Sequence, residues 1–237
     1  MITDRLPRIG ILGGTGKEGG GLAFRWAHAG YSVFLGSRLP EKAINAAAAM
    51  NKELGISSVC GGSNPEAAMA AQIVVLTVPY AAQKSTLLEV QAALKGKILV
   101  DVTVPLVPPK VNRVQLPENG SAVEAMQKIL GADVRVVSAF QNVSAHHLKD
   151  MERVTECDVL VCSDDPAASD EVIKLVYATG LRGWNGGVLA NSVVAEGLTS
   201  VLIALNQRYK VPSAGIRITG IPDSKVNIRE GYGWSCP

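Results

Sequence analysis

Short apolar runs alternate with amphipathic segments along most of the chain. The apolar runs predict strands at 8–12, 31–35, around Val59, and at 73–78, 98–102, 135–139, 159–162 and 181–184. Between them, the helical period predicts helices after Gly14 and at 40–54, 64–71, 80–94, 121–130 and 166–180. Asn64 before Pro65 is predicted to be the N-cap of the helix at 64–71. Because each pair of parallel strands needs a crossover helix, this alternation predicts an α/β fold with a mostly parallel sheet covered on both faces.

The pattern changes after residue 186, where the alternation gives way to one long helical segment at 190–208. We therefore expect a first domain over 1–186 and a small helical carboxyl-terminal part with a polar tail over 187–237. The long helix carries an apolar stripe made of Val194, Leu198, Val201, Leu202 and Leu205. Such a stripe predicts a core face or the contact face of a homodimer. Glu196 and Thr199 share another face, which either borders a cleft or is solvated.

Composition and charge narrow the class of function. Hydrophobic residues make up 47% of the 237 residues and charged residues 19%, which is typical of a globular chain with a substantial core. The formal net charge is +2, no basic block is present, and aromatic residues reach 5%. Nucleic acid is therefore not an expected partner, and a small molecule is the expected substrate.

The chain carries little that indicates export, a membrane or a metal. Its amino terminus lacks an apolar run of signal-peptide length, and the apolar runs at 73–78 and 98–106 are too short to cross a membrane. The four cysteines are widely spaced, which predicts free thiols in a cytoplasmic protein. His146 and His147 lie near Asp150, but no further ligand follows at a recognised spacing, so we expect no metal site.

A glycine-rich turn follows the first predicted strand and opens the first predicted helix. Its sequence at 14–19 fits the G-x-G-x-x-G pattern in the required strand–turn–helix context. In that pattern Gly14 permits the tight turn, Gly16 lets a pyrophosphate approach the backbone, and Gly19 lets helix and strand pack closely. Free N–H groups at a helix start bind anions. We therefore expect a Rossmann-type, doubly wound parallel sheet whose dinucleotide is held by Gly14, Thr15, Gly16, Lys17, Glu18 and Gly19.

Two comparisons refine the identity of this nucleotide. A nucleoside triphosphate loop of the Walker A type is excluded, because Ile11 and Glu18 stand where that loop needs glycine and a hydroxyl residue. At the end of the second strand, an NAD enzyme would place an acid to bind the ribose 2′-hydroxyl. This sequence has Ser37 and Arg38 instead, which together with Thr15 suit a 2′-phosphate and favour NADP. For Arg38 alone, a solvated loop arginine is the alternative.

The end of the fourth predicted strand offers a second contact with the dinucleotide. Open parallel sheets bind ligands at the carboxyl ends of their strands, so we expect Thr77, Val78 and Pro79 to contact the nicotinamide. Tyr80 and Lys84 also fit the Y-x-x-x-K pattern of short-chain dehydrogenases. That short spacing arises easily by chance, so we favour the loop over a tyrosine acid.

Several motifs together resemble one known family. The matching segments are Ile11–Gly16, Gly36–Arg38, Leu76–Pro79, Val137–Phe140, Asn206–Lys210 and Ala214–Thr219. Their order and residues are similar to those of the F420H2:NADP oxidoreductases, the NADPH-dependent reductases of the deazaflavin coenzyme F420. The first segment is shared with many dehydrogenases, whereas the later ones are more specific. The resemblance implies a Rossmann domain with a small helical carboxyl-terminal part, a dimer, and hydride transfer between NADPH and the deazaflavin.

The resemblance also places two residues after the sixth predicted strand at the reaction site. It implies that Ala139 lies against the cofactor and that Gln141 is the catalytic residue, where the family usually has histidine. Glutamine donates and accepts hydrogen bonds, so it could position a carbonyl group, but it takes up no proton. Two alternatives stay open at this point. One is an NADPH-dependent reductase of another small acceptor, such as an imine or a ferric chelate, and the other is a non-catalytic NADP(H)-binding sensor.

Overall fold

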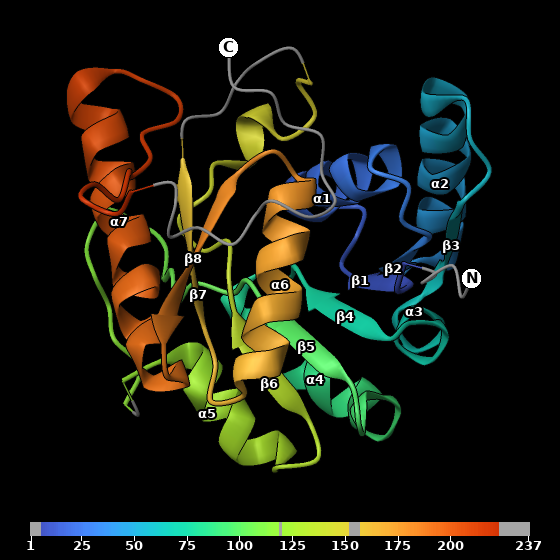
Figure 1. Ribbon diagram of the computed structural model, residues 1–237, viewed down its shortest axis with the longest axis horizontal. Coiled ribbons are helices and arrows are strands. Elements are labelled where there is room, and N and C mark those ends of the chain that lie inside the picture. Colours follow the sequence, from blue (N-terminus) through green and yellow to red (C-terminus); the bar gives the residue numbers. More distant parts are fainter. Residues whose placement is uncertain (1–5, 119, 152–156, 223–237) are drawn as a thin grey trace.

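One sheet of eight strands runs through the part of the chain that the computed structural model describes, residues 6–118, 120–151 and 157–222 (Figure 1). The strands are β1 (Ile9–Leu12), β2 (Val33–Ser37), β3 (Val59–Ser63), β4 (Ile73–Leu76), β5 (Ile98–Asp101), β6 (Arg135–Ser138), β7 (Asp158–Cys162) and β8 (Arg182–Gly187). Their order across the sheet is β3-β2-β1-β4-β5-β6-β7-β8. Neighbours are parallel except β6 and β7, which are antiparallel.

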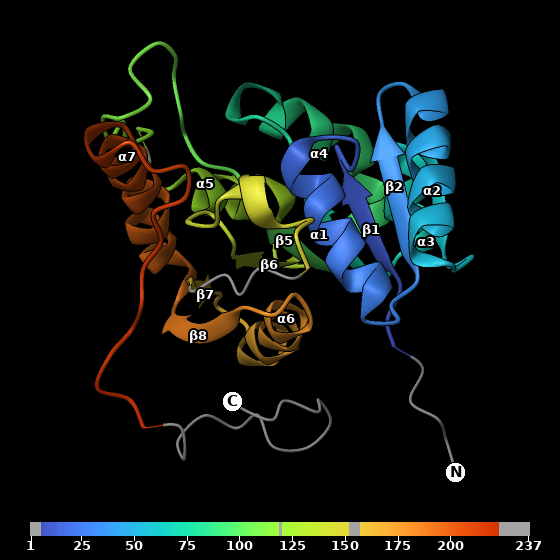
Figure 2. The ribbon, with the colours of Figure 1, turned by 90° about the horizontal axis from the view of Figure 1, so that it is seen from above.

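Helices cover both faces of this sheet. They are α1 (Lys17–His28), α2 (Pro40–Leu54), α3 (Asn64–Ala70), α4 (Tyr80–Leu94), α5 (Ala122–Leu130), α6 (Pro166–Ala178) and α7 (Ser192–Tyr209). Apolar side chains of α1, α2 and α6 form one hydrophobic core with the sheet, and those of α3, α4 and α5 form a second core on the opposite face. Helix α7 follows the last strand and packs beside α5 and β7, at the end of the sheet away from β3 (Figure 2).

The chain reverses its direction of travel across the sheet between β1 and β4. Helices α1 and α2 lead from β1 outward to β3, and α3 then brings the chain back to β4 on the other side of β1. Such a reversal opens a crevice at the carboxyl ends of the two central strands, where doubly wound sheets bind ligands. The loop after β4 closes on β1 here, because the N–H and the hydroxyl of Thr77 both donate to the Leu12 carbonyl, at 3.0 and 2.9 Å.

The predicted α/β class, the order of the elements and the parallel character of the sheet are confirmed. Three local predictions are wrong. The second strand begins at Val33, because the chain before it still turns back onto α1 through the Tyr31 N–H and the Trp26 carbonyl. The fourth strand ends at Leu76, where Thr77 bends toward β1. Helix α3 is capped by Ser63 in a reciprocal capping box with Glu66, not by Asn64, whose side chain turns to the glycine loop instead.

Helix α7 divides the predicted apolar stripe between two faces. Leu202 is buried and Leu198 half-buried, whereas Val194, Val201 and Leu205 are 61%, 45% and 39% exposed. By length and composition alone, Leu189–Tyr209 could cross a membrane, with a mean hydropathy of 1.4 and 33% of its most apolar window buried. That evidence is weak, because the core helix of a soluble protein meets the same criteria. Glu196 is 1% exposed, so the solvated-face alternative for it is wrong.

Strand β8 runs to Gly187, and α7 begins five residues later at Ser192. The division of the chain into 1–186 and 187–237 stays a prediction. Most of the polar tail and Cys236 lie outside the described residues. Cys60, Cys157 and Cys162, which the structure describes, are free thiols.

Candidate active site

The glycine turn joins β1 to α1 and leaves the N–H groups in the first turn of α1 open. Helix α1 starts at Gly16 without a side-chain cap, so its first-turn N–H groups remain available to an anion. A Cβ on Gly16 would approach only the Gly13 carbonyl, at 3.3 Å, whereas a Cβ on Gly19 would collide with the Thr77 hydroxyl. The left-handed backbone lies at Gly13, with φ 77°, one residue before the predicted tight-turn position. Gly14 is ordinary in φ, and its N–H donates to the Gly36 carbonyl at 2.9 Å.

That hydrogen bond brings the turn beside the end of β2. Arg38 and Thr15 are exposed, and neither side chain has a partner among the described residues. Ser37 is 8% exposed, and its hydroxyl accepts the Leu39 N–H at 3.1 Å while keeping its own hydrogen to donate. A cation and two hydroxyl groups thus lie near the crevice with no carboxylate bound to any of them.

Asn64 binds the main chain of the glycine turn, and no sequence motif predicts this role. Its side chain is 2% exposed, and its Oδ1 accepts the Gly13 N–H at 3.2 Å. A Cβ on Gly36 would meet the same Oδ1 at 2.8 Å, so the carboxyl ends of β1 and β2 both pack closely against this amide. The signal was present as an asparagine at a helix start, but local sequence favoured a capping role over a contact reaching 51 residues back.

Glu18 and Lys17 occupy the first turn of α1 with different surroundings. Lys17 is exposed, whereas Glu18 is half-buried without an ion pair to a described residue, and burial raises its pKa to about 8. Glu18 shares a helix face with Leu22 and Arg25, at spacings of four and seven residues. Arg25 donates from Nε to the Leu148 carbonyl at 2.7 Å, so this face is turned toward the segment after β6.

The end of β6 makes a sharp, left-handed turn at Phe140, with φ 71°. This conformation is unfavourable for a side chain with a Cβ, and tight packing holds it. The Phe140 ring is fully buried and meets Trp26 edge to face, with centroids 5.9 Å apart. Ala139 is also fully buried, in the same core, so its methyl group does not reach the crevice surface. Its predicted contact with the cofactor stays a prediction.

The turn at Phe140 carries Gln141 under the end of β5. The Gln141 side chain is 3% exposed, and its Nε2 donates to the Asp101 carbonyl and to the Ser138 hydroxyl oxygen, both at 2.8 Å. A carbonyl can only accept, so this contact decides which end of the amide is nitrogen. Oε1 is buried and has no partner among the described residues. Gln141 therefore has a buried acceptor without a partner among the described residues, whereas the sequence predicts that it positions a carbonyl group by donating.

Asp101 and Glu196 are buried carboxyl groups near Gln141, and no sequence motif predicts either of them as part of the site. Asp101 is 0% exposed and accepts from Gln83 Nε2 at 2.7 Å and from the Thr103 N–H at 2.9 Å. Glu196 lies on α7 and accepts hydrogen bonds from Ser121 and the first N–H groups of α5. Burial raises the pKa of both carboxyl groups, and the charge of Asp101 raises that of Glu196 further.

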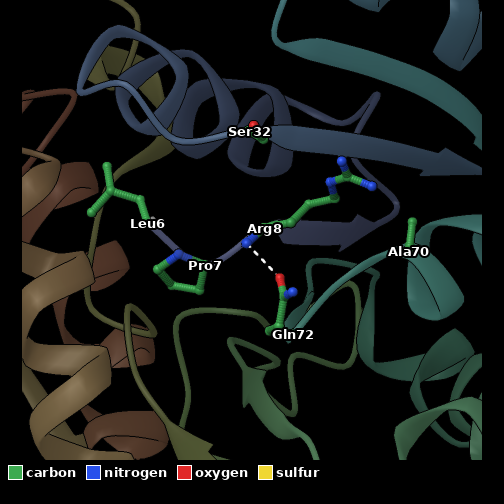
Figure 3. A pocket seen from close by; sticks show the side chains of 6 residues that line it. All are labelled: Leu6, Pro7, Arg8, Ser32, Ala70 and Gln72. Atoms are coloured by element: carbon green, nitrogen blue, oxygen red, sulfur yellow. Dashed lines mark hydrogen bonds between the residues drawn. The ribbon is translucent and has the colours of Figure 1, made fainter. Parts of the chain in front are cut away.

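The other candidates form no second site among the described residues. Tyr80 and Lys84 lie on α4, with no hydrogen bond between them. Among the residues that the structure describes, no three His, Cys, Asp or Glu side chains converge as metal ligands. A pocket beside Arg8 and Gln72 lies at the amino ends of β1 and β4, the edge opposite to the glycine turn (Figure 3). Ligands of such sheets bind at the carboxyl ends, so this pocket is not the candidate site.

Known proteins share both the sequence and the fold. Residues 8–105 match the family model described as NADP oxidoreductase, coenzyme F420-dependent. The F420-dependent NADP reductase of Methanothermobacter thermautotrophicus is 39% identical over 232 residues, covering 95% of this chain and 100% of that protein. The F420-dependent NADP reductase of Methanocaldococcus jannaschii is 40% identical over 222 residues, covering 90% and 99%. A crystal structure assigned to an F420-dependent NADP reductase from Arthrobacter sp. FB24 superposes with a TM-score of 0.76 at 26% identity, covering 91% and 100%.

Proposed function

The chain belongs to the family of coenzyme F420-dependent NADP oxidoreductases, and from this membership we propose that it transfers hydride between NADP(H) and coenzyme F420. The observation that carries the proposal is the identity of about 40% with F420-dependent NADP reductases, sustained over nine-tenths or more of both chains. The NADP-dependent oxidoreductase class follows from the same relatives. Reduction of an imine or of a ferric chelate, and a non-catalytic sensor, are the competing functions.

We propose that the crevice residues bind NADP in two places. The open N–H groups at the start of α1 fit the pyrophosphate, which Gly14, Thr15, Gly16, Lys17, Glu18 and Gly19 would surround. The unpaired guanidinium of Arg38, with the hydroxyl groups of Ser37 and Thr15, fits the 2′-phosphate. The absence of a carboxylate at the end of β2 removes the usual partner of a 2′-hydroxyl and supports NADP over NAD.

The hydride donor and acceptor are supplied by the nicotinamide and the deazaflavin when both are bound, so the protein has to align them and exclude water. Thr77, Val78 and Pro79 follow β4 at the crevice, and in this proposal they would contact the nicotinamide. Gln141 Oε1, which is buried without a partner among the described residues, would accept an N–H of the second ring. Because an amide does not titrate, Gln141 orients its ligand and carries no proton.

We further propose that the enzyme is a homodimer through α7. Val194, Leu198, Val201 and Leu205 recur at helical spacing, and three of them are exposed. Stripes of this kind on a protein surface usually find a partner, and a second copy of the same helix is an equally apolar one. The cytoplasmic location and the absence of nucleic acid or membrane partners stay predictions.

The decisive experiment is NADPH oxidation by the purified protein, followed by absorbance with coenzyme F420 as acceptor. Parallel reactions contain a cyclic imine or a ferric chelate in place of F420. Oxidation that depends on F420 and on enzyme concentration supports the proposal. Oxidation only with the imine or the chelate would replace the acceptor, and NADPH binding without turnover on any acceptor would favour the sensor.

A further inference from the structure

A closed ring of hydrogen bonds connects Gln141 to helix α7 by two routes. On the first route, Gln141 Nε2 donates to the Asp101 main chain, and the Asp101 carboxylate accepts from Gln83. Gln83 Nε2 also lies 3.3 Å from the Ala122 carbonyl, at the start of α5. On the second route, the Thr199 hydroxyl on α7 donates directly to the Gln141 carbonyl at 2.7 Å.

Glu196 closes the ring between α5 and α7. Its Oε2 accepts the Ala122 N–H at 2.8 Å, and its Oε1 accepts the Ser121 hydroxyl at 2.7 Å and the Val123 N–H at 3.2 Å. First-turn N–H groups have no partner within their own helix, so α7 supplies the acceptor that α5 needs. With a side chain 1% exposed, Glu196 has no water to replace these contacts if they are lost.

The position of α7 along α5 therefore depends on Glu196, and the position of Thr199 depends on α7. The two residues are three apart on one helix, so a shift or rotation of α7 at Glu196 moves the Thr199 hydroxyl with it. Thr199 holds the main chain of Gln141, whose side-chain oxygen Oε1 is buried and has no partner among the described residues.

We propose that Glu196 is a positioning residue for hydride transfer, which sets the place of Gln141 through α7 and Thr199 without touching either substrate. The inference rests on the proposed function for its kinetic effect. In this proposal Glu196 controls the alignment of the acceptor and does not affect the binding of NADPH at the other end of the crevice.

Glu196→Gln is the sharpest perturbation, because it keeps size and shape. Donors approach both carboxylate oxygens, so the amide nitrogen of glutamine faces a backbone N–H in either orientation. One contact is lost, and we expect kcat with F420 to fall about tenfold while KM for NADPH stays within about twofold. Glu124→Gln on α5 is the matched control, since among the described residues the Glu124 carboxylate pairs only with the exposed Lys128. We expect it to leave both constants unchanged.

Rates are expressed per NADPH-binding site, counted by titration, so that partial unfolding of a variant does not lower kcat. A fall in kcat per site for Glu196→Gln supports the proposal, and an unchanged kcat per site overturns it. An equal rise of KM for NADPH would place Glu196 in cofactor binding and would also overturn it.

A double-mutant cycle tests the route through Thr199. Thr199→Val removes the hydroxyl at nearly constant volume, and Thr199→Ser keeps it, so we expect loss of kcat in the first variant and rescue in the second. If Glu196 acts through Thr199, adding Glu196→Gln to Thr199→Val lowers kcat little further. Two independent losses that multiply to about a hundredfold would refute the route.

One measurement separates this proposal from the proposed function. In 15N-labelled protein, the side-chain amide of Gln141 is assigned by its disappearance in Gln141→Ala. The proposal expects that resonance to shift in Glu196→Gln and to stay in place in Glu124→Gln, whichever substrate the enzyme uses. An unmoved resonance overturns the positioning role, whereas a shifted resonance in an enzyme inactive with F420 refutes only the choice of acceptor.

Discussion

Replacing Arg38 by alanine tests the assignment of NADP most directly. The side chain is exposed and has no partner among the described residues, so the substitution removes no packing and no internal hydrogen bond. The whole effect therefore falls on the ligand. Hydrogen bonds to a charged group contribute about 1.5 to 3 kcal/mol. At 1.4 kcal/mol for each factor of ten, NADPH should bind about 10- to 150-fold more weakly to Arg38→Ala, and NADH should bind as it does to the wild type.

Calorimetry with both cofactors measures these affinities, and Arg8→Ala provides the control. Arg8 is also exposed, carries the same charge and lies at the amino ends of the strands (Figure 3), so its loss reproduces the change in net charge without touching the crevice. We expect Arg8→Ala to bind NADPH like the wild type. Equal wild-type affinity for NADPH and NADH, or an equal loss of both in Arg38→Ala, would refute the assignment of the 2′-phosphate to this site.

Three further predictions use other parts of the molecule. Because Gln141 does not titrate, kcat with F420 should be flat from about pH 6 to 8, apart from the ionisation of the deazaflavin. Gln141→His should add an inflection at about pH 6.5, and Gln141→Ala should slow turnover about tenfold. A flat profile for Gln141→His would place residue 141 away from the acceptor. Burial raises the pKa of Glu18 to about 8, so protonated Glu18 stabilises the folded state. This contribution to the free energy of unfolding is fully present below the ordinary carboxyl pKa and is lost as pH rises through about 8. NADP affinity should fall over the same rise, as a carboxylate forms beside the pyrophosphate, and the fall should be absent in Glu18→Gln when followed by fluorescence titration. Sedimentation should give twice the 24.9 kDa of the chain and a monomer for Val201→Glu, whereas a monomeric wild type at tens of micromolar would contradict the α7 interface.

The sequence by itself determined the elements and the nucleotide end of the crevice. Strands and helices follow from short-range periodicity, and the glycine turn with Ser37 and Arg38 follows from motifs whose residues are close along the chain. The conformations that these motifs need are local, so the predicted turn is present in the structure with a small shift, the left-handed residue lying at Gly13. The binding of NADP by these residues stays a prediction.

The acceptor end of the crevice was decided by the tertiary structure alone. Gln141 and Asp101 are 40 residues apart, and Glu196 and Ser121 are 75 residues apart, so no local sequence pattern predicts their contacts. Which atom of the Gln141 amide stays free depends on the carbonyl that β5 places against its nitrogen. Whether Glu196 is solvated or buried depends on where α7 packs. The free Gln141 atom and the burial of Glu196 both depend on the order of strands in the sheet and on which helices pack together. A buried polar group needs a partner within the protein because water cannot reach it.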